Sequence, residues 1–190
     1  AILLYFFSGA PIRNLLFLIP VVALSIGALA LIAPYRVARL TTFFNRQHDP
    51  LGASYQIRQV LLGLGSGGLT GVGIGKSRQK YEYLPEANTD SIFAIIGEET
   101  GFAGGALVIF AYLFIVWRGF RIAQRAQDSF GRLLALGISS WVAVQSIINL
   151  GAMVALVPLT GVPLPFISYG GSSFIILLAA MGILANISKM

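Results

Sequence analysis

The protein is a chain of 190 residues, of which 56% are hydrophobic and only 11% charged, with a mean hydropathy of +0.82. Soluble domains carry about 25% charged residues, so this composition excludes a soluble globular domain and predicts an all-α, polytopic membrane protein. The net charge is +6, but the cations lie mainly between apolar runs, which indicates contact with membrane lipids rather than nucleic acid. The chain has no cysteine, which excludes disulfides and thiolate metal sites.

Apolar runs set the expected architecture of a single membrane domain. The chain begins inside an apolar run, residues 1–8, without an initiator Met, which predicts a fragment that starts within a span. About 20 apolar residues cross the hydrocarbon of a bilayer. We therefore expect four complete spans, at residues 15–33, 92–117, 133–157 and 172–188. The long connection between the first two of these, residues 34–91, is expected to hold short helices rather than a sheet.

The two short connections predict the orientation of the chain. Residues 118–132 hold four arginines and one aspartate, whereas residues 158–171 hold no charge. Cytoplasmic loops are enriched in Lys and Arg, so the first connection is expected inside and the second outside. Residues 34–91 then also lie outside, although they carry seven Lys or Arg, because a connection of 58 residues is near the length at which the rule weakens.

The most polar stretch of the chain, residues 76–90, precedes an apolar run. It combines three cations, three carboxylates, two tyrosines and a proline, and it ends in Asp90 at the expected mouth of a membrane helix. An acid in that position is a candidate catalytic group. The alternatives are a solvated interhelical loop and a helix cap, because a helix that starts at about Ser91 would place Asp90 at its N-cap.

The glycines before and inside the apolar run at residues 92–117 have structural explanations. Residues 63–68 match G-x-G-x-x-G, but no β-α-β unit surrounds them, which excludes a dinucleotide site. Farther on, three glycines repeat every four residues and form one smooth face on which another helix can pack closely: Gly97, Gly101 and Gly105. That partner could be the membrane anchor of another protein.

Polar residues inside the apolar runs are expected to have structural partners. Glu98 and Glu99 lie about two turns into a span, where a charge is costly, so we expect helix packing and an internal ion pair for one of them. A proton pathway is the alternative. Gln145 and Asn149 share one face of the next span and are expected to form interhelical hydrogen bonds.

The uncharged connection after the run at residues 133–157 is expected to lie against protein rather than lipid. Irregular backbone at membrane depth is tolerated only against protein or a cavity. Residues 163–173 contain two prolines and a Tyr-Gly-Gly turn. We expect them to fold back toward the outer face near Asp90 and to line a substrate groove.

Residues 77–90, followed by residues 92–99, closely resemble the SEDS proteins (shape, elongation, division and sporulation; FtsW, RodA and SpoVE). Within that family the chain is more similar to FtsW, the division member, than to RodA. Further segments match in the same order, at residues 35–40, 65–68 and 163–173. The resemblance extends over essentially the whole chain and implies the C-terminal half of a SEDS-type helical bundle.

The resemblance implies a peptidoglycan glycosyltransferase of the bacterial cytoplasmic (inner) membrane, with residues 34–91 facing the periplasm. Such an enzyme polymerises lipid II into glycan strands linked to undecaprenyl pyrophosphate, in contact with membrane lipids and with a class B penicillin-binding protein, the transpeptidase. Asp90 matches the family's essential aspartate and is expected to be the general base for the sugar hydroxyl. A lipid II flippase and a non-catalytic division scaffold are the alternative functions.

Other polar and turn residues are expected to bind the substrate. Three cations would face the pyrophosphate, with general attraction to headgroups as the alternative: Lys76, Arg78 and Lys80. Three residues of the uncharged connection would line the groove: Tyr169, Gly170 and Ser172. Glu86, four residues before Asp90, is expected to raise the proton affinity of Asp90 or to help hold a divalent cation. That cation, Mg or Mn, is the one candidate cofactor. The alternative is that Glu86 is a plain turn residue.

Overall fold

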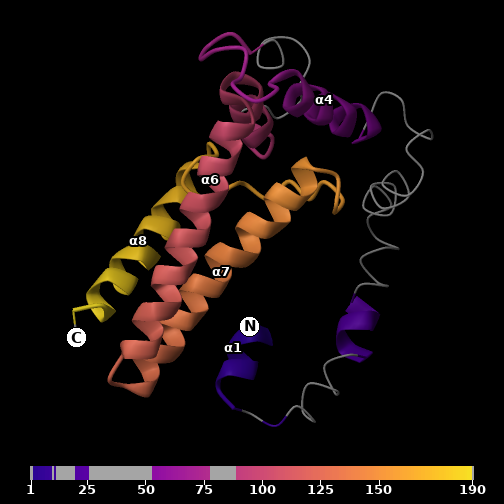
Figure 1. The fold of residues 1–190 in the computed structure, drawn as a ribbon. Coiled ribbons are helices and arrows are strands. Elements are labelled where there is room, and N and C mark those ends of the chain that lie inside the picture. Colours follow the sequence, from indigo (N-terminus) through magenta and orange to yellow (C-terminus); the bar gives the residue numbers. More distant parts are fainter. Residues whose placement is uncertain (1, 10, 12–19, 26–52, 78–88, 190) are drawn as a thin grey trace.

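The computed structural model describes residues 2–9, 11, 20–25, 53–77 and 89–189 (Figure 1). Its named helices in this part of the chain are α1 (Ile2–Phe7), α4 (Ala53–Ser66), α6 (Ile92–Arg125), α7 (Ser129–Met153) and α8 (Gly171–Ile187). Residues 20–25 are also helical, and the described residues contain no strand. The predicted all-α class is therefore confirmed, and α4 lies within the connection that was expected to hold short helices.

Helices α6 and α7 lie side by side, α8 contacts both, and α4 packs against one end of the pair (Figure 1). Among the described residues, α6 and α7 are long and apolar enough to cross a membrane, and α8 is a shorter apolar helix of 17 residues. Large apolar side chains of α6 point outward; Phe102, for example, is 72% exposed. Such a surface suits lipid or another membrane helix. The expected span at 15–33 lies mostly outside the described residues.

The connection predicted at residues 118–132 is largely helical. Helix α6 continues to Arg125 and α7 already begins at Ser129, so only residues 126–128 separate them. Arg, Gln and Ala are strong helix formers, and a helix can extend beyond the hydrocarbon into the headgroups. Conversely, α7 ends at Met153, so residues 154–157 of the predicted run belong to the following connection.

Asp128 fixes the start of α7. Its carboxylate accepts a hydrogen bond of 2.6 Å from the Gly131 backbone N–H. Asp128→Ala is expected to lower the free energy of unfolding by about 1 kcal/mol, the usual effect of losing an N-cap, whereas Asp128→Asn should retain it because Asn caps equally well. Thermal unfolding of the purified variants checks this; equal loss in both would show that the charge, and not the cap, matters.

Helix α6 breaks at Gly101, whose backbone has φ 69° and ψ −165°. A break in a helix leaves carbonyl and N–H groups without their helical partners. The turn after α4, residues 67–73, supplies new ones through four backbone hydrogen bonds: Val72 N to Glu98 O (3.0 Å), Gly73 N to Glu99 O (3.1 Å), Phe102 N to Gly68 O (2.9 Å) and Ala103 N to Leu69 O (3.2 Å). The turn thus forms hydrogen bonds with the backbone of α6 on both sides of the break.

The predicted glycine face is only partly a helix-packing surface. A Cβ on Gly97 would lie 2.4 Å from Leu64 of α4, which agrees with close helix packing. Gly101 instead faces backbone of the turn 67–73, with Gly71 N 2.4 Å from its ideal Cβ, and Gly105 faces Phe93 of its own helix. The partner of Gly101 is therefore an irregular turn and not a helix, because four-residue spacing identifies a smooth surface but not what covers it. A contact of this face with another protein stays a prediction.

Two clusters of buried apolar side chains hold the two ends of the helix pair. One joins α4, the start of α6, the end of α7 and the connection after it, and it includes Val60, Phe93 and Met153. The other joins the far ends of α6 and α8 to the first half of α7, and it includes Ala123, Ile138 and Leu184. The first cluster positions the residues described next.

Candidate active site

Asp90 is buried immediately before α6. Its side chain is 7% exposed, and the Thr89 hydroxyl donates to its Oδ1 over 3.4 Å. The helix cap is Ser91, whose side chain makes no capping hydrogen bond. The alternative role of Asp90, the N-cap of α6, is therefore wrong by one residue, because the helix begins at Ile92 and Ser91 holds the N-cap position.

Asn149 of α7 ties Asp90 to the connection after α7. Its Nδ2 group donates to the Asp90 carbonyl (2.9 Å) and to the Val162 carbonyl (2.7 Å). Gln145, one turn earlier, donates to the Pro163 carbonyl (2.8 Å). The expected interhelical partners of both amides are thus backbone carbonyls outside the helices, because irregular backbone within a membrane protein needs donors from its neighbours.

The connection of residues 154–170 is held in an unusual backbone conformation. Ala155 and Phe166 have positive φ angles of 57° and 66°. Such angles are costly for residues with a Cβ and persist only where the surroundings enforce them. The enforcing contacts include a bond from Leu164 N to Ser168 Oγ (2.7 Å) and a short bond from the Tyr112 hydroxyl to the Pro165 carbonyl. As expected, the structure brings this connection beside Asp90.

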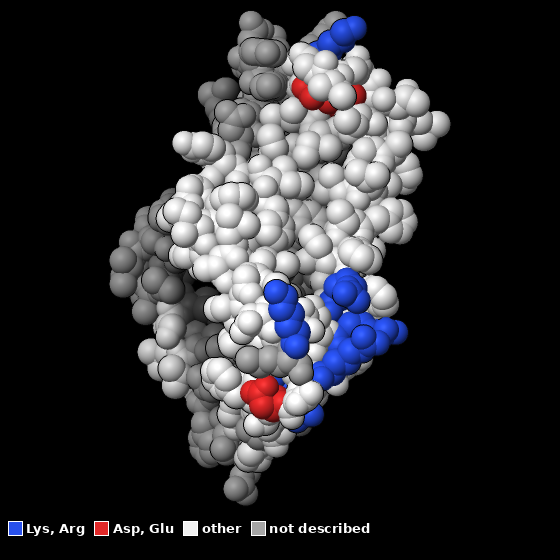
Figure 2. Space-filling model, turned by 90° about the vertical axis from the view of Figure 1, so that its left-hand side faces the viewer, with Lys and Arg blue, Asp and Glu red and all other residues white. Residues whose placement is uncertain are grey.

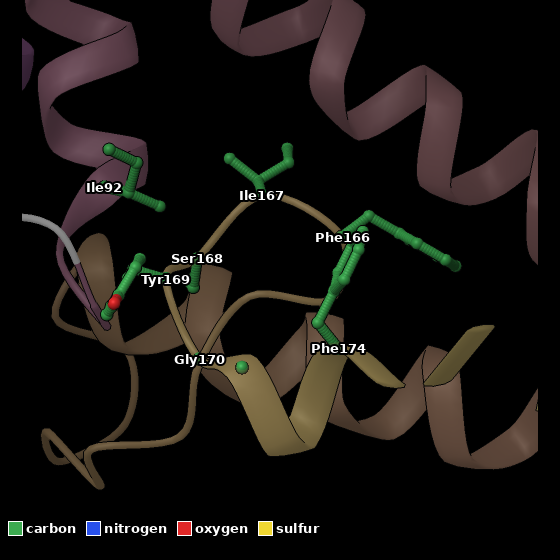
Figure 3. A pocket seen from close by; sticks show the side chains of 8 residues that line it. Ile92, Phe166, Ile167, Ser168, Tyr169, Gly170 and Phe174 are labelled. Atoms are coloured by element: carbon green, nitrogen blue, oxygen red, sulfur yellow. The ribbon is translucent and has the colours of Figure 1, made fainter. Parts of the chain in front are cut away.

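An open pocket of about 590 Å³ lies between this connection and the start of α6. Its walls are Ile92, Phe166, Ile167, Ser168, Tyr169, Gly170, Gly171 and Phe174. Figure 3 shows Ile92 and Tyr169 on one side of it and Phe166 and Phe174 on the other. Tyr169 is 79% exposed, so its ring and hydroxyl are available to a ligand. Of the predicted groove residues, Tyr169 and Gly170 line the pocket, whereas Ser172 is exposed on the first turn of α8 and does not.

A second, apolar cavity of about 490 Å³ lies on the other side of α6. It is bounded by α4, by the glycine face of α6 and by Val154. Phe93 lines this cavity and its neighbour Ile92 lines the open pocket. The residues directly after Asp90 therefore separate a pocket with polar groups from an apolar one.

Glu98 connects α6 to the segment that leads toward the polar stretch. It is 3% exposed, and the Ser77 hydroxyl donates to its Oε2 over 2.5 Å. Lys76, the residue before, is exposed and lies in a turn closed by its N–H and the Gly73 carbonyl (3.1 Å). The ion pair expected for one of Glu98 and Glu99 stays a prediction, as does a proton pathway.

Arg78, Lys80 and Glu86 lie outside the described residues. Among the described residues no cluster of three His, Cys, Asp or Glu side chains is suited to a metal ion. Asp90 is thus the one described carboxylate of the predicted cation site, and a divalent cation stays a prediction.

Comparison with known proteins identifies the family. The family whose model matches residues 1–190 is described as "Cell cycle protein" and comprises FtsW, RodA and SpoVE. The chain belongs to this FtsW/RodA/SpoVE family. It is 47% identical to stage V sporulation protein E of Bacillus subtilis over 99% of the chain and 51% of the relative. It is 41% identical to the probable peptidoglycan glycosyltransferase FtsW of Thioalkalivibrio sulfidiphilus, over 98% of the chain and 47% of the relative.

Solved structures of similar proteins agree with this family. A chain from a study titled "Structural coordination of polymerization and crosslinking by a peptidoglycan synthase complex" superposes with a TM-score of 0.70 at 26% identity, over 98% of this chain and 52% of that one. A point mutant of the rod shape determining protein RodA from Thermus thermophilus superposes with a TM-score of 0.53 at 32% identity, over 68% of this chain and 39% of that one. The chain therefore spans about half the length of these relatives.

Several residues of this family member were not singled out by the sequence. Ser77, Ser168 and Tyr112 each make a contact that shapes the site, as described above. Gln56 of α4 also donates to the Ser91 hydroxyl over 3.2 Å. The contacts of Ser77, Tyr112 and Gln56 join residues far apart in the chain, so no local spacing could indicate them. Ser168, in contrast, accepts from Leu164, only four residues before it. The one available signal was a hydroxyl or amide inside an apolar run, because a polar group buried there needs a hydrogen-bond partner.

Asn149→Leu should loosen the site. It removes the donor for two buried carbonyls while roughly conserving volume, so we expect the free energy of unfolding to fall by roughly 1–3 kcal/mol. Thermal unfolding of the full-length protein in detergent measures this. Asn186→Leu, an exposed position on α8, is the matched control and should change stability by less than about 0.5 kcal/mol. Equal effects at both positions would show that the Asn149 bonds do not hold the site.

Proposed function

We propose that the full-length protein is a peptidoglycan glycosyltransferase that polymerises lipid II, with Asp90 as its general base. The observation that carries the proposal is a buried carboxylate at the start of a membrane helix, two residues from the wall of an open pocket. The names of the relatives support the same activity, because several are probable peptidoglycan glycosyltransferases at 41–52% identity. The similar synthase complex couples polymerisation to crosslinking, which supports a class B penicillin-binding protein as partner.

The proposed reaction is a transfer of a glycosyl group to a sugar hydroxyl. Asp90 accepts the hydroxyl proton while the hydroxyl oxygen forms a bond to the anomeric carbon of the donor. The bond from that carbon to the lipid pyrophosphate breaks, and the pyrophosphate leaves with the electron pair. Cations stabilise this leaving group, a role for which the chain offers Lys76, Arg78 and Lys80. The site faces outward in this proposal.

The two cavities at the start of α6 fit a substrate with a polar and an apolar part. The open pocket offers an exposed tyrosine and irregular backbone for sugars and phosphates. The apolar cavity beyond Phe93 offers aliphatic and aromatic walls for a polyprenyl chain. Lipid-linked sugars have both parts, whereas a soluble sugar nucleotide would leave the apolar cavity without a ligand.

Purified full-length protein, incubated with labelled lipid II in vesicles and with its transpeptidase partner, tests the proposal. Glycan polymer that forms only in the presence of the protein supports it. Translocation of lipid II without polymer would indicate a flippase, and neither activity would indicate a scaffold. An added inhibitor of the transpeptidase should leave polymer formation intact, because crosslinking is a separate reaction.

A further inference from the structure

A basic pocket lies at the end of α6 that is far from Asp90. It has a volume of about 230 Å³ and lies between the last turns of α6 and the end of α8. Its walls are Arg118, Arg121, Ile122, Arg125, Ile187 and Ser188. Figure 2 shows the basic side chains gathered at this end of the molecule. The proposed transfer reaction uses none of these residues.

The three arginines share one face of α6 because they recur at intervals of three and four residues. The Arg121 guanidinium lies over the Trp117 ring, 5.2 Å from its centre, which holds that side chain in place. Within the described residues none of the three forms an ion pair, and the nearby Asp128 is engaged as the cap of α7. The pocket therefore concentrates positive charge that the described chain does not neutralise.

The pocket also lies at the depth of the lipid headgroups. The apolar part of α6 ends at Trp117, and the helix continues beyond it to Arg125. Trp117 then falls at the membrane interface, where tryptophan is enriched. The arginines follow directly after it, and Ile122 and Ile187 add apolar walls beside them. This combination matches a ligand with an anionic head and an apolar body.

We propose that this pocket binds the phosphate group of an anionic membrane phospholipid. Basic pockets between membrane helices are suited to such headgroups. Guanidinium groups can donate two parallel hydrogen bonds to one phosphate, which lysines cannot do. A bound lipid would contact both α6 and the end of α8, at the end of the helices that is far from Asp90.

Native mass spectrometry of the full-length protein, with dioleoyl phosphatidylglycerol or dioleoyl phosphatidylcholine added, tests this proposal. The wild type should bind phosphatidylglycerol preferentially. Each basic residue near an anionic headgroup strengthens binding by roughly fivefold, so Arg118→Gln combined with Arg125→Gln should weaken it by about 25-fold. The control pair, Arg132→Gln with Lys189→Gln, removes equal charge at the same end outside the pocket and should have a much smaller effect.

A second variant separates recognition from insertion. Arg118→Lys combined with Arg125→Lys keeps the charges that orient the protein in the membrane, and it should bind phosphatidylglycerol more weakly than the wild type but better than the Gln pair. Equal binding by the wild type and the Lys pair, or equal losses in the pocket pair and the control pair, would overturn the proposal. Inorganic phosphate is added as a competitor in the last experiment. If it displaces phosphatidylglycerol at a concentration similar to that of the lipid, the ligand is a soluble phosphate and the lipid assignment is wrong.

Discussion

Asn in place of Asp90 is expected to lower the rate of lipid II polymerisation by roughly two to four orders of magnitude, the usual contribution of a general base. The substitution removes the proton acceptor and leaves the shape of the side chain almost unchanged. The Asp90 backbone carbonyl, which accepts from Asn149, is unaffected by it. Ser91, and not Asp90, holds the N-cap position of α6, so the start of the helix should be unaffected as well. A gel assay of glycan chains made by the full-length protein measures the loss.

Asp128→Asn is the matched control, because it makes the same chemical change at the opposite end of α6. Its activity should stay close to that of the wild type, since asparagine retains the cap. Membrane insertion and binding to the transpeptidase should be normal in both variants. Near-normal polymerisation by Asp90→Asn would remove Asp90 from the mechanism and leave it a purely structural role.

The apolar runs predicted the helices well because one physical requirement governs them. A backbone in hydrocarbon must satisfy its own hydrogen bonds, so runs of about 20 apolar residues are helical. The same requirement correctly predicted that residues 163–173 would lie against protein near Asp90. It did not predict that α6 extends to Arg125, because a helix outside the bilayer follows local propensity and capping rather than hydropathy.

The break at Gly101 could not be predicted from the sequence. Gly97, Gly101 and Gly105 have the same spacing, yet only Gly101 leaves the helical conformation. The difference arises from the turn 67–73, which is distant in the chain and supplies the backbone partners that make the break tolerable. Similarly, the amides of Gln145 and Asn149 were correctly expected to form hydrogen bonds, but their acceptors depended on a tertiary arrangement that periodicity does not encode.

Leu in place of Gly101 is expected to lower the free energy of unfolding by about 4 kcal/mol. A side chain at φ 69° and ψ −165° is strained by roughly 1–3 kcal/mol. Its Cβ would also lie 2.4 Å from Gly71 N and 2.6 Å from the Leu69 carbonyl, and overpacking of this kind costs about 1–3 kcal/mol more. These neighbours are backbone atoms, so they cannot move aside without breaking the hydrogen bonds between the turn and α6.

The effect should also reach the site, because the turn 67–73 leads to Ser77 and its bond with Glu98. Thermal unfolding and polymerisation by the full-length protein should therefore both decline. Gly182→Leu is the control: this glycine of α8 is exposed, and its ideal Cβ meets no atom within 4 Å. Gly101→Ala should lose nearly as much stability as Gly101→Leu, since strain and collision both begin at Cβ. If Gly101→Ala instead unfolds at the same temperature as Gly182→Leu, the turn does not hold α6 in its broken form.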